Sequence, residues 1–137
     1  MRRLLAITSL IVLAACGAAA SVDPTPASFA GTWFLTSLNG DGLPYVLQAA
    51  NPKREILNDA LAVNANGTFV RNHLFRTTNG TTVTIQSVAD TGTFALAGNA
   101  VTFRLNNDGS TLAGSIAGNR LTVAEAGFIY GYTRPEY

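Results

Sequence analysis

Between residues 29 and 134 the chain alternates apolar and polar positions with a period of two, the spacing of a half-buried β-strand. Short runs rich in Val, Ile, Thr, Phe and Leu recur about every ten residues, and turns rich in Gly and Asn separate them. No sustained amphipathic-helix pattern occurs in this region. The pattern predicts nine strands, at residues 31–38, 43–48, 54–64, 68–77, 81–97, 100–106, 111–117, 120–125 and 128–134.

The turn residues predict how these strands pair, because the length of a hairpin turn sets its register. A three-residue turn at 65–67 pairs Val63 with Phe69, Leu61 with Arg71, Asp59 with His73 and Leu57 with Phe75. A similar turn at 78–80 pairs Phe75 with Val83 and His73 with Ile85. The later turns pair Leu96 with Val101, Phe94 with Phe103, Leu105 with Leu112, Ile116 with Leu121, Val123 with Tyr130 and Leu121 with Tyr132.

These pairings place the large apolar side chains on a single face of the sheet. The expected inward residues are Trp33, Leu35, Leu57, Leu61, Val63, Phe69, Phe75, Val83, Ile85, Phe94, Phe103, Ile116 and Tyr130. Along the fifth strand the inward positions change from odd-numbered to even-numbered residues between Ile85 and Phe94. We therefore expect a β-bulge near residues 90–92. A continuous apolar face on this many antiparallel strands has to close on itself or fold over. We therefore predict an all-β fold, an antiparallel up-and-down β-barrel of eight or nine strands.

The N-terminal segment has the pattern of an export signal. Arg2 and Arg3 precede an apolar run, residues 4–13, that is too short to span a bilayer as a permanent helix. Residues 17–28 are small, polar and proline-bearing, as in a flexible spacer. We therefore expect a signal peptide at 1–15, a modified cysteine with its tether at 16–28, and the barrel domain at 29–137.

The signal ends in Leu13-Ala14-Ala15-Cys16, which resembles the lipobox of bacterial lipoproteins. The resemblance implies that the Cys16 thiol carries a diacylglycerol and that the protein is anchored to a membrane of the cell envelope. Gly17 follows instead of the Asp that resembles an inner-membrane retention signal, which favours the outer membrane, on its periplasmic or surface face. An ordinary secretory signal with an incidental cysteine is the alternative.

Short motifs along the predicted barrel resemble the lipocalins. The segment Gly31-Thr32-Trp33 is similar to their Gly-X-Trp opening, and Asn64-Ala65-Asn66-Gly67-Thr68-Phe69 and Asp90-Thr91-Gly92-Thr93-Phe94 look like stretches of bacterial lipocalin-like lipoproteins. The resemblance covers residues 31–134. It implies an eight-stranded calycin barrel in which the tryptophan packs across the closed end. It also implies an arginine stacked on that tryptophan, and Arg134 is the candidate by position.

The balance of charges argues against a nucleic-acid partner. Removal of the signal takes away two of the nine basic residues and none of the eight acidic ones, and Lys53 is the only lysine. No basic stripe remains to contact phosphates. Cys16 is the only cysteine, so no disulfide can form within the chain.

The inner wall of an eight-stranded barrel either fills with side chains or holds one small ligand. Both outcomes stay open here. The candidate ligand-binding residues are Trp33, Leu57, Asp59, Leu61, Phe69, Arg71, His73, Phe75, Ile85, Phe94, Phe103 and Tyr130.

Three charged or polar side chains, Asp59, Arg71 and His73, stand on this apolar face, with Glu55 one step beyond. Buried charges need partners, so we expect a cross-strand ion pair at the barrel rim, a polar group that orients a ligand head, or a carboxylate–imidazole pair for proton transfer. One histidine with scattered carboxylates falls short of a metal site, and no cofactor is implied.

No nucleophile motif, zinc-protease motif or phosphate-binding glycine loop occurs, so we expect a protein that is not an enzyme. The leading hypothesis is a lipid-anchored, lipocalin-like protein that binds a small hydrophobic molecule in the barrel. The alternative is an envelope protein-interaction module, similar to barrel-shaped protease inhibitors, with a filled core and no ligand. A protein partner is not indicated by the sequence.

Overall fold

The computed structural model describes residues 22–135; the signal peptide predicted at residues 1–15 and the predicted lipidation site Cys16 lie outside this range. One helical turn, α1 (Pro26–Phe29), is followed by nine strands. These are β1 (Gly31–Leu38), β2 (Tyr45–Gln48), β3 (Lys53–Val63), β4 (Thr68–Asn79), β5 (Thr82–Ala97), β6 (Ala100–Leu105), β7 (Thr111–Ala117), β8 (Arg120–Glu125) and β9 (Phe128–Thr133). The strand boundaries agree closely with the predicted ranges.

The strands form one antiparallel sheet that closes into a barrel. Its order is β1-β9-β8-β7-β6-β5-β4-β3-β2, and β1 also pairs with β3, with Trp33 opposite Leu61. Eight strands therefore close the ring, and β2 is an extra strand on the outer end of β3. The predicted all-β up-and-down barrel is confirmed, and its architecture is compatible with a calycin-like fold.

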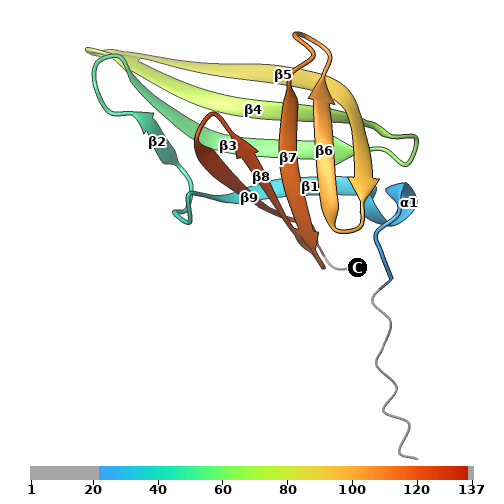
Figure 1. The fold of residues 1–137 in the computed structure, drawn as a ribbon. Helices are drawn as coiled ribbons and strands as arrows, with labels where there is room; N and C mark the ends of the chain where they lie inside the picture. The colour runs from blue at the N-terminus through green and yellow to red at the C-terminus, as the bar shows by residue number, and fades with distance from the viewer. Residues whose placement is uncertain (1–21, 136–137) are drawn as a thin grey trace, which may run out of the picture.

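Three strands are much longer than the others. β5 has 16 residues, β4 has 12 and β3 has 11, whereas β6 and β8 have six each. In Figure 1 the long strands run beyond the short ones on the left, where β2 joins them. The barrel thus has a compact closed end near α1 and an open end from which part of the sheet projects.

The alternation of side chains places the apolar residues inside, as expected from the period of two. Most of the predicted inward residues are buried. The buried apolar set is Phe29, Trp33, Leu35, Leu38, Ile56, Leu61, Val63, Phe69, Phe94, Val101, Phe103, Leu105, Leu112, Ile116, Leu121, Val123, Tyr130 and Tyr132.

Most of the predicted strand pairs are confirmed. The β3–β4 hairpin pairs Val63 with Phe69, Leu61 with Arg71 and Asp59 with His73. The hairpins after it pair Leu96 with Val101, Phe94 with Phe103, Ile116 with Leu121, Val123 with Tyr130 and Leu121 with Tyr132. The pair of Leu105 with Leu112 is wrong by two residues, since Leu112 lies opposite Phe103. A shift of two keeps both leucines on the inner face.

The predicted inward position of Leu57 is wrong. A register irregularity between Ile56 and Asn58 places Ile56 opposite Phe75 and turns Leu57 off the core. Ile56 is fully buried, whereas Leu57 is only partly buried. The bulge also moves Glu55 to the opposite face from Asp59, because an extra residue changes the parity of the strand.

The predicted pairings of Val83 and Ile85 are also wrong. β4 continues to Asn79 and β5 begins at Thr82 opposite it, so two residues make the turn instead of three. Phe75 then faces Gln86 and His73 faces Val88. Val83 and Ile85 lie on the outer face and are 57% and 61% exposed.

The bulge expected near residues 90–92 is not present, because the shorter turn already corrects the parity. The β4–β5 and β5–β6 ladders run without interruption through this region.

The closed end is sealed by α1. Thr25 caps the turn, and the Phe29 ring packs 5.3 Å from both Trp33 and Phe94, centroid to centroid. Residues 26–28, expected to belong to the flexible spacer, thus form part of the seal. The Arg134 guanidinium lies 4.8 Å from the centre of the Trp33 ring, which confirms the stack implied by the lipocalin resemblance.

Candidate functional site

A buried polar network lies between the aromatic core, which fills the closed end of the barrel, and the open end. Its centre is Asp59 on β3, which is fully buried, and its basic members are Arg71 and His73 on β4. The hairpin register brings the three together: His73 lies directly opposite Asp59, and Arg71 is two residues away on the same face. The predicted clustering of these three residues is confirmed.

One oxygen of Asp59 receives almost all of the contacts. Oδ2 accepts hydrogen bonds from Arg71 Nε at 2.9 Å and from the Tyr132 hydroxyl at 2.8 Å, and His73 Nδ1 lies 3.2 Å away. Burial by itself raises the pKa of the Asp59 carboxyl, but the His73 and Arg71 contacts outweigh it and hold this pKa below its usual range. Asp59 is therefore a buried carboxylate stabilised in its charged form.

Arg71 joins two carboxylates. Its Nη1 donates to Glu125 Oε2 at 2.7 Å, on the far side from Asp59, and its guanidinium lies 4.6 Å from the centre of the Tyr130 ring. Glu125 is the outermost of these groups, with a side chain 24% exposed. The network therefore runs from the buried Asp59 through Arg71 to a carboxylate at the open end.

His73 lies between two carboxylates. Its Nδ1 faces Asp59, and its Nε2 lies 3.0 Å from Asp90 Oδ2 on β5. The imidazole also stacks on Phe75, with ring centres 5.6 Å apart. Nε2 is at hydrogen-bond distance from its carboxylate, whereas Nδ1 lies within ion-pair range of Asp59 but makes no hydrogen bond. A proton-transfer site needs one nitrogen directed at a substrate, and here each ring nitrogen faces a carboxylate of the network.

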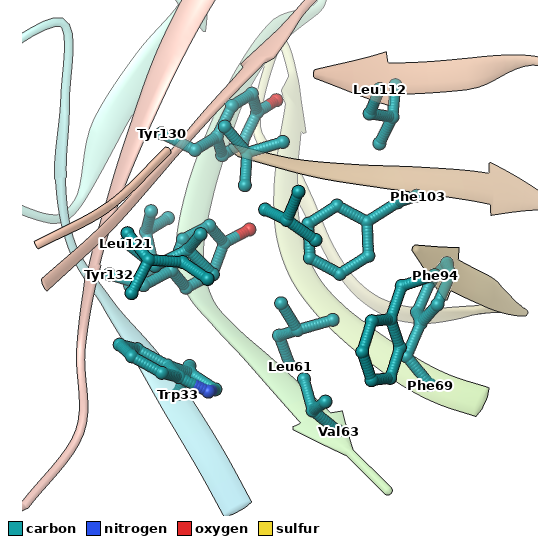
Figure 2. Packing of buried hydrophobic residues seen from close by; sticks show 14 of the residues in the cluster. Trp33, Leu61, Val63, Phe69, Phe94, Phe103, Leu112, Leu121, Tyr130 and Tyr132 are labelled. Atoms are coloured by element: carbon teal, nitrogen blue, oxygen red, sulfur yellow. The ribbon is translucent and has the colours of Figure 1, made fainter. Parts of the chain in front are cut away.

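The barrel interior between the polar network and the closed end is filled with side chains. Figure 2 shows the rings of Phe69, Phe94 and Phe103 gathered with Leu61 in its centre. Phe69 and Phe103 pack edge to face at 5.1 Å. The cavity left among these side chains measures about 10 Å³, which is room for about one water molecule.

An open pocket lies on the other side of the polar network, at the open end of the barrel. Its volume is about 320 Å³, at the lower end of the range of small-molecule sites. Side chains from β2, β3, β4, β9 and the end of β8 line it: Leu47, Gln48, Arg54, Phe75, Glu125, Ala126, Phe128 and Tyr130. We call this the mouth pocket.

The mouth pocket has aromatic walls and one cation without a carboxylate partner. The Arg54 guanidinium lies 4.3 Å from the centre of the Phe75 ring, and no ion pair joins it to any residue in the range 22–135. Glu125, by contrast, is already neutralised by Arg71. The arrangement can hold an apolar or aromatic body between the rings and an anionic group at Arg54.

The structure divides the predicted ligand-binding residues into separate places. Phe75 and Tyr130 line the mouth pocket, and Asp59, Arg71 and His73 lie beneath it. Leu61, Phe69, Phe94 and Phe103 are in the filled core, and Trp33 seals the closed end. Leu57 and Ile85 do not belong to the inner wall.

Among the charged residues of the site, sequence reasoning missed three: Arg54, Asp90 and Glu125. Asp90 could have been found by pairing Asn79 with Thr82, since that register places Asp90 opposite Arg71. Glu125 has no such signal, because it contacts Arg71 across the barrel and not on a neighbouring strand.

Within residues 22–135 no group of three or more His, Cys, Asp or Glu side chains is arranged to hold a metal ion. The same residues include no helix that is both long and apolar enough to cross a membrane. Comparison with known proteins adds no family to this picture: no family model, no curated protein and no solved structure matches the chain.

Proposed function

We propose that this protein is a lipid-anchored lipoprotein of the bacterial cell envelope that binds a small amphipathic molecule in the mouth pocket and catalyses no reaction. The observation that carries the proposal is the contrast between a filled interior, with a cavity of about 10 Å³, and an aromatic pocket of about 320 Å³ at the open end. A ligand deep in the barrel, which was the leading hypothesis from the sequence beside a filled interior, would have to displace the packed aromatic core. Binding at the mouth requires no such change.

The chemistry of the pocket favours an anionic head on an apolar body. Phe75, Phe128 and Tyr130 contribute aromatic side chains to its lining, and Leu47 contributes an aliphatic one. Arg54 is the cation available to a carboxylate or similar group, because Arg71 is committed to Asp59 and Glu125. The polar network contacts the pocket through Tyr130, because the Arg71 guanidinium packs against the Tyr130 ring.

The anchor is supported by the sequence, through the lipobox-like segment that ends at Cys16. Residue 22, where the described part of the chain begins, precedes α1 at the closed end, whereas β2, which lines the mouth pocket, lies at the other end of the barrel (Figure 1). Six residue steps of extended chain reach at most about 20 Å. An anchored domain would therefore hold its closed end towards the membrane and its mouth away from it, as suits capture of a ligand from the surrounding compartment.

The test uses residues 22–137, which include every strand and the whole described core. Titration calorimetry with dodecanoate, and with dodecanol as its uncharged counterpart, measures the contribution of the anionic head. We expect dodecanoate to bind at least about tenfold more tightly than dodecanol. Arg54→Ala should remove this difference, and Phe75→Ala should weaken both ligands.

Arg120→Ala is the matched control, because Arg120 is an exposed arginine on β8 outside the mouth pocket. Equal affinity for the two ligands, no binding of either, or the same loss in Arg120→Ala as in Arg54→Ala would contradict the proposal. Mass spectrometry of the full chain purified from membranes would then identify a natural ligand.

A protein-interaction module is the second candidate, and the filled core favours it. In that case the chain would retain a protein partner from envelope extracts and would bind neither amphiphile. The two candidates therefore differ in the calorimetric result.

A further inference from the structure

The projecting half of β5 is a sheet edge without a partner strand among the described residues. β6 pairs with β5 only from Gly92 to Ala97, whereas β4 pairs with it from Thr82 onwards. Residues 82–90 therefore have a hydrogen-bonded neighbour on one side only. In Figure 1 this half of β5 forms the upper border of the projecting sheet, with β4 below it.

This edge lacks the features that usually prevent strand pairing. Proteins protect exposed edges with Lys, Pro, bulges or very short strands. The segment Thr81-Thr82-Val83-Thr84-Ile85-Gln86-Ser87-Val88-Ala89 has no charge and no proline, and its ladder with β4 contains no bulge. Val83 and Ile85 are both more than half exposed. β-Branched residues of this kind have high strand propensity.

The opposite edge of the same sheet is protected in the ordinary way. β2 has only four residues, its pairing with β3 is irregular, and Pro44 and Pro52 lie on either side of it. The contrast shows that the projecting sheet offers one edge for pairing and not two.

We infer that the protein forms a two-fold dimer in which β5 pairs antiparallel with β5 of a second copy. This inference is independent of the mouth pocket. An antiparallel pairing centred on Ile85 places Val83 opposite Ser87, Thr84 opposite Gln86 and Gly80 opposite Asp90, so no like charges meet. The nearest basic side chain on β4, Arg76, is already neutralised by Glu55 at 2.8 Å. Because the strand has no charged side chain between residues 81 and 89, two copies of it can pair without electrostatic repulsion.

The dimer closes. A two-fold contact uses the β5 edge of both copies, and the protected β2 edge offers no site for further addition. The two projecting sheets would then form one continuous sheet of eight strands, with four strands (β2 to β5) from each copy. Assembly stops at two chains and does not continue into a filament.

The experiment is sedimentation equilibrium of the full chain in density-matched detergent. It compares the wild-type sequence with two edge variants, Ile85→Lys and Val83→Lys. Ile85→Lys places two like charges next to each other at the two-fold axis, and Val83→Lys places a charge opposite Ser87 of the second copy, on a strand that otherwise has none. We expect a dimer for the unmodified chain and an increase of at least about tenfold in the dissociation constant for either variant. Ile129→Lys is the control, since Ile129 is 48% exposed on β9, away from this edge.

Circular dichroism checks that each variant keeps its β-structure, which is expected because Val83 and Ile85 do not contribute to the core. The inference is overturned by a monomeric chain, by a dimer that persists in both edge variants, by equal dissociation in Ile129→Lys, or by open-ended assemblies larger than two.

Discussion

The guanidinium of Arg71 lies 2.8 Å from the carboxylate of Asp59, and both side chains are almost completely buried. A buried pair of this kind contributes little relative to apolar residues of the same volume, but the loss of one partner leaves a charge without compensation. Here the removal of Arg71 would leave Asp59 with only Tyr132 and His73 as polar neighbours and would leave Glu125 without its ion pair. The pair is therefore a point where a single substitution has a large effect.

Arg71→Met should lower the free energy of unfolding by about 3–5 kcal/mol, as measured by urea denaturation. Arg76→Ala removes a partly exposed arginine from its ion pair with Glu55, which keeps Lys53 as a second partner at 2.9 Å, and should cost much less than Arg71→Met. The double variant Asp59→Asn/Arg71→Met should lose less than the sum of the two single variants, because each removes the charge that the other leaves unpaired. Strict additivity would contradict this account.

Acid should destabilise the fold. The hydrogen bonds from Arg76 and Lys53 lower the pKa of Glu55 to about 2, and the pKa of Asp59 is also below its usual range. A carboxyl group whose pKa is lower in the folded state stabilises the fold above its ordinary pKa and loses this effect as the pH falls through the folded value. The free energy of unfolding should therefore decrease between about pH 4.5 and pH 2.

Denaturant titration across this range checks the acid effect, and Glu55→Gln should make the decrease shallower. An unchanged slope in Glu55→Gln would show that Glu55 does not contribute to it.

The stack of Arg134 on Trp33 should stabilise the closed end. Arg134 Nη1 also donates to the carbonyl oxygen of Ser28 at 2.7 Å, so the side chain ties α1 to the end of the barrel. Arg134→Ala should cost about 1–3 kcal/mol and shift the fluorescence of Trp33, the only tryptophan, to longer wavelength. Arg134→Lys should recover only part of the loss, because an ammonium lacks the planar guanidinium. Arg120→Ala should leave the spectrum unchanged.

Gly92 should not tolerate a side chain. A Cβ atom at this position would overlap the carbonyl oxygen of Arg104 and lie 2.7 Å from the Phe69 ring. We expect Gly92→Ala to lower the free energy of unfolding by about 1–3 kcal/mol, as for other overpacked cores. Gly42→Ala is the control, since a Cβ there meets nothing within 4 Å. A thermal shift for Gly92→Ala no larger than the control would contradict the prediction.

The accuracy of most of the predicted strand pairs depended on the length of the turn before them, whereas the error at Leu57 came from an irregularity within β3. Where Asn66-Gly67 or Gly98-Asn99 marked the turn clearly, the register was correct, and Asp59 was placed opposite His73. At Asn79-Gly80 a three-residue turn and a two-residue turn were both compatible with the residues. The wrong choice placed Ile85 inside the barrel and required a bulge that does not exist.

Local pattern alone was sufficient for the strands, their antiparallel order and most of the inner face, because alternation and turn chemistry act between residues that are close in sequence. Only the tertiary structure decided whether the barrel is hollow or filled, since that depends on how rings such as Phe69 and Phe103 from different strands share the interior. It also decided that Glu125 meets Arg71 across the barrel and that half of β5 projects without a partner. These features arise from closure of the sheet, which joins residues far apart in the chain and leaves no periodic trace in the sequence.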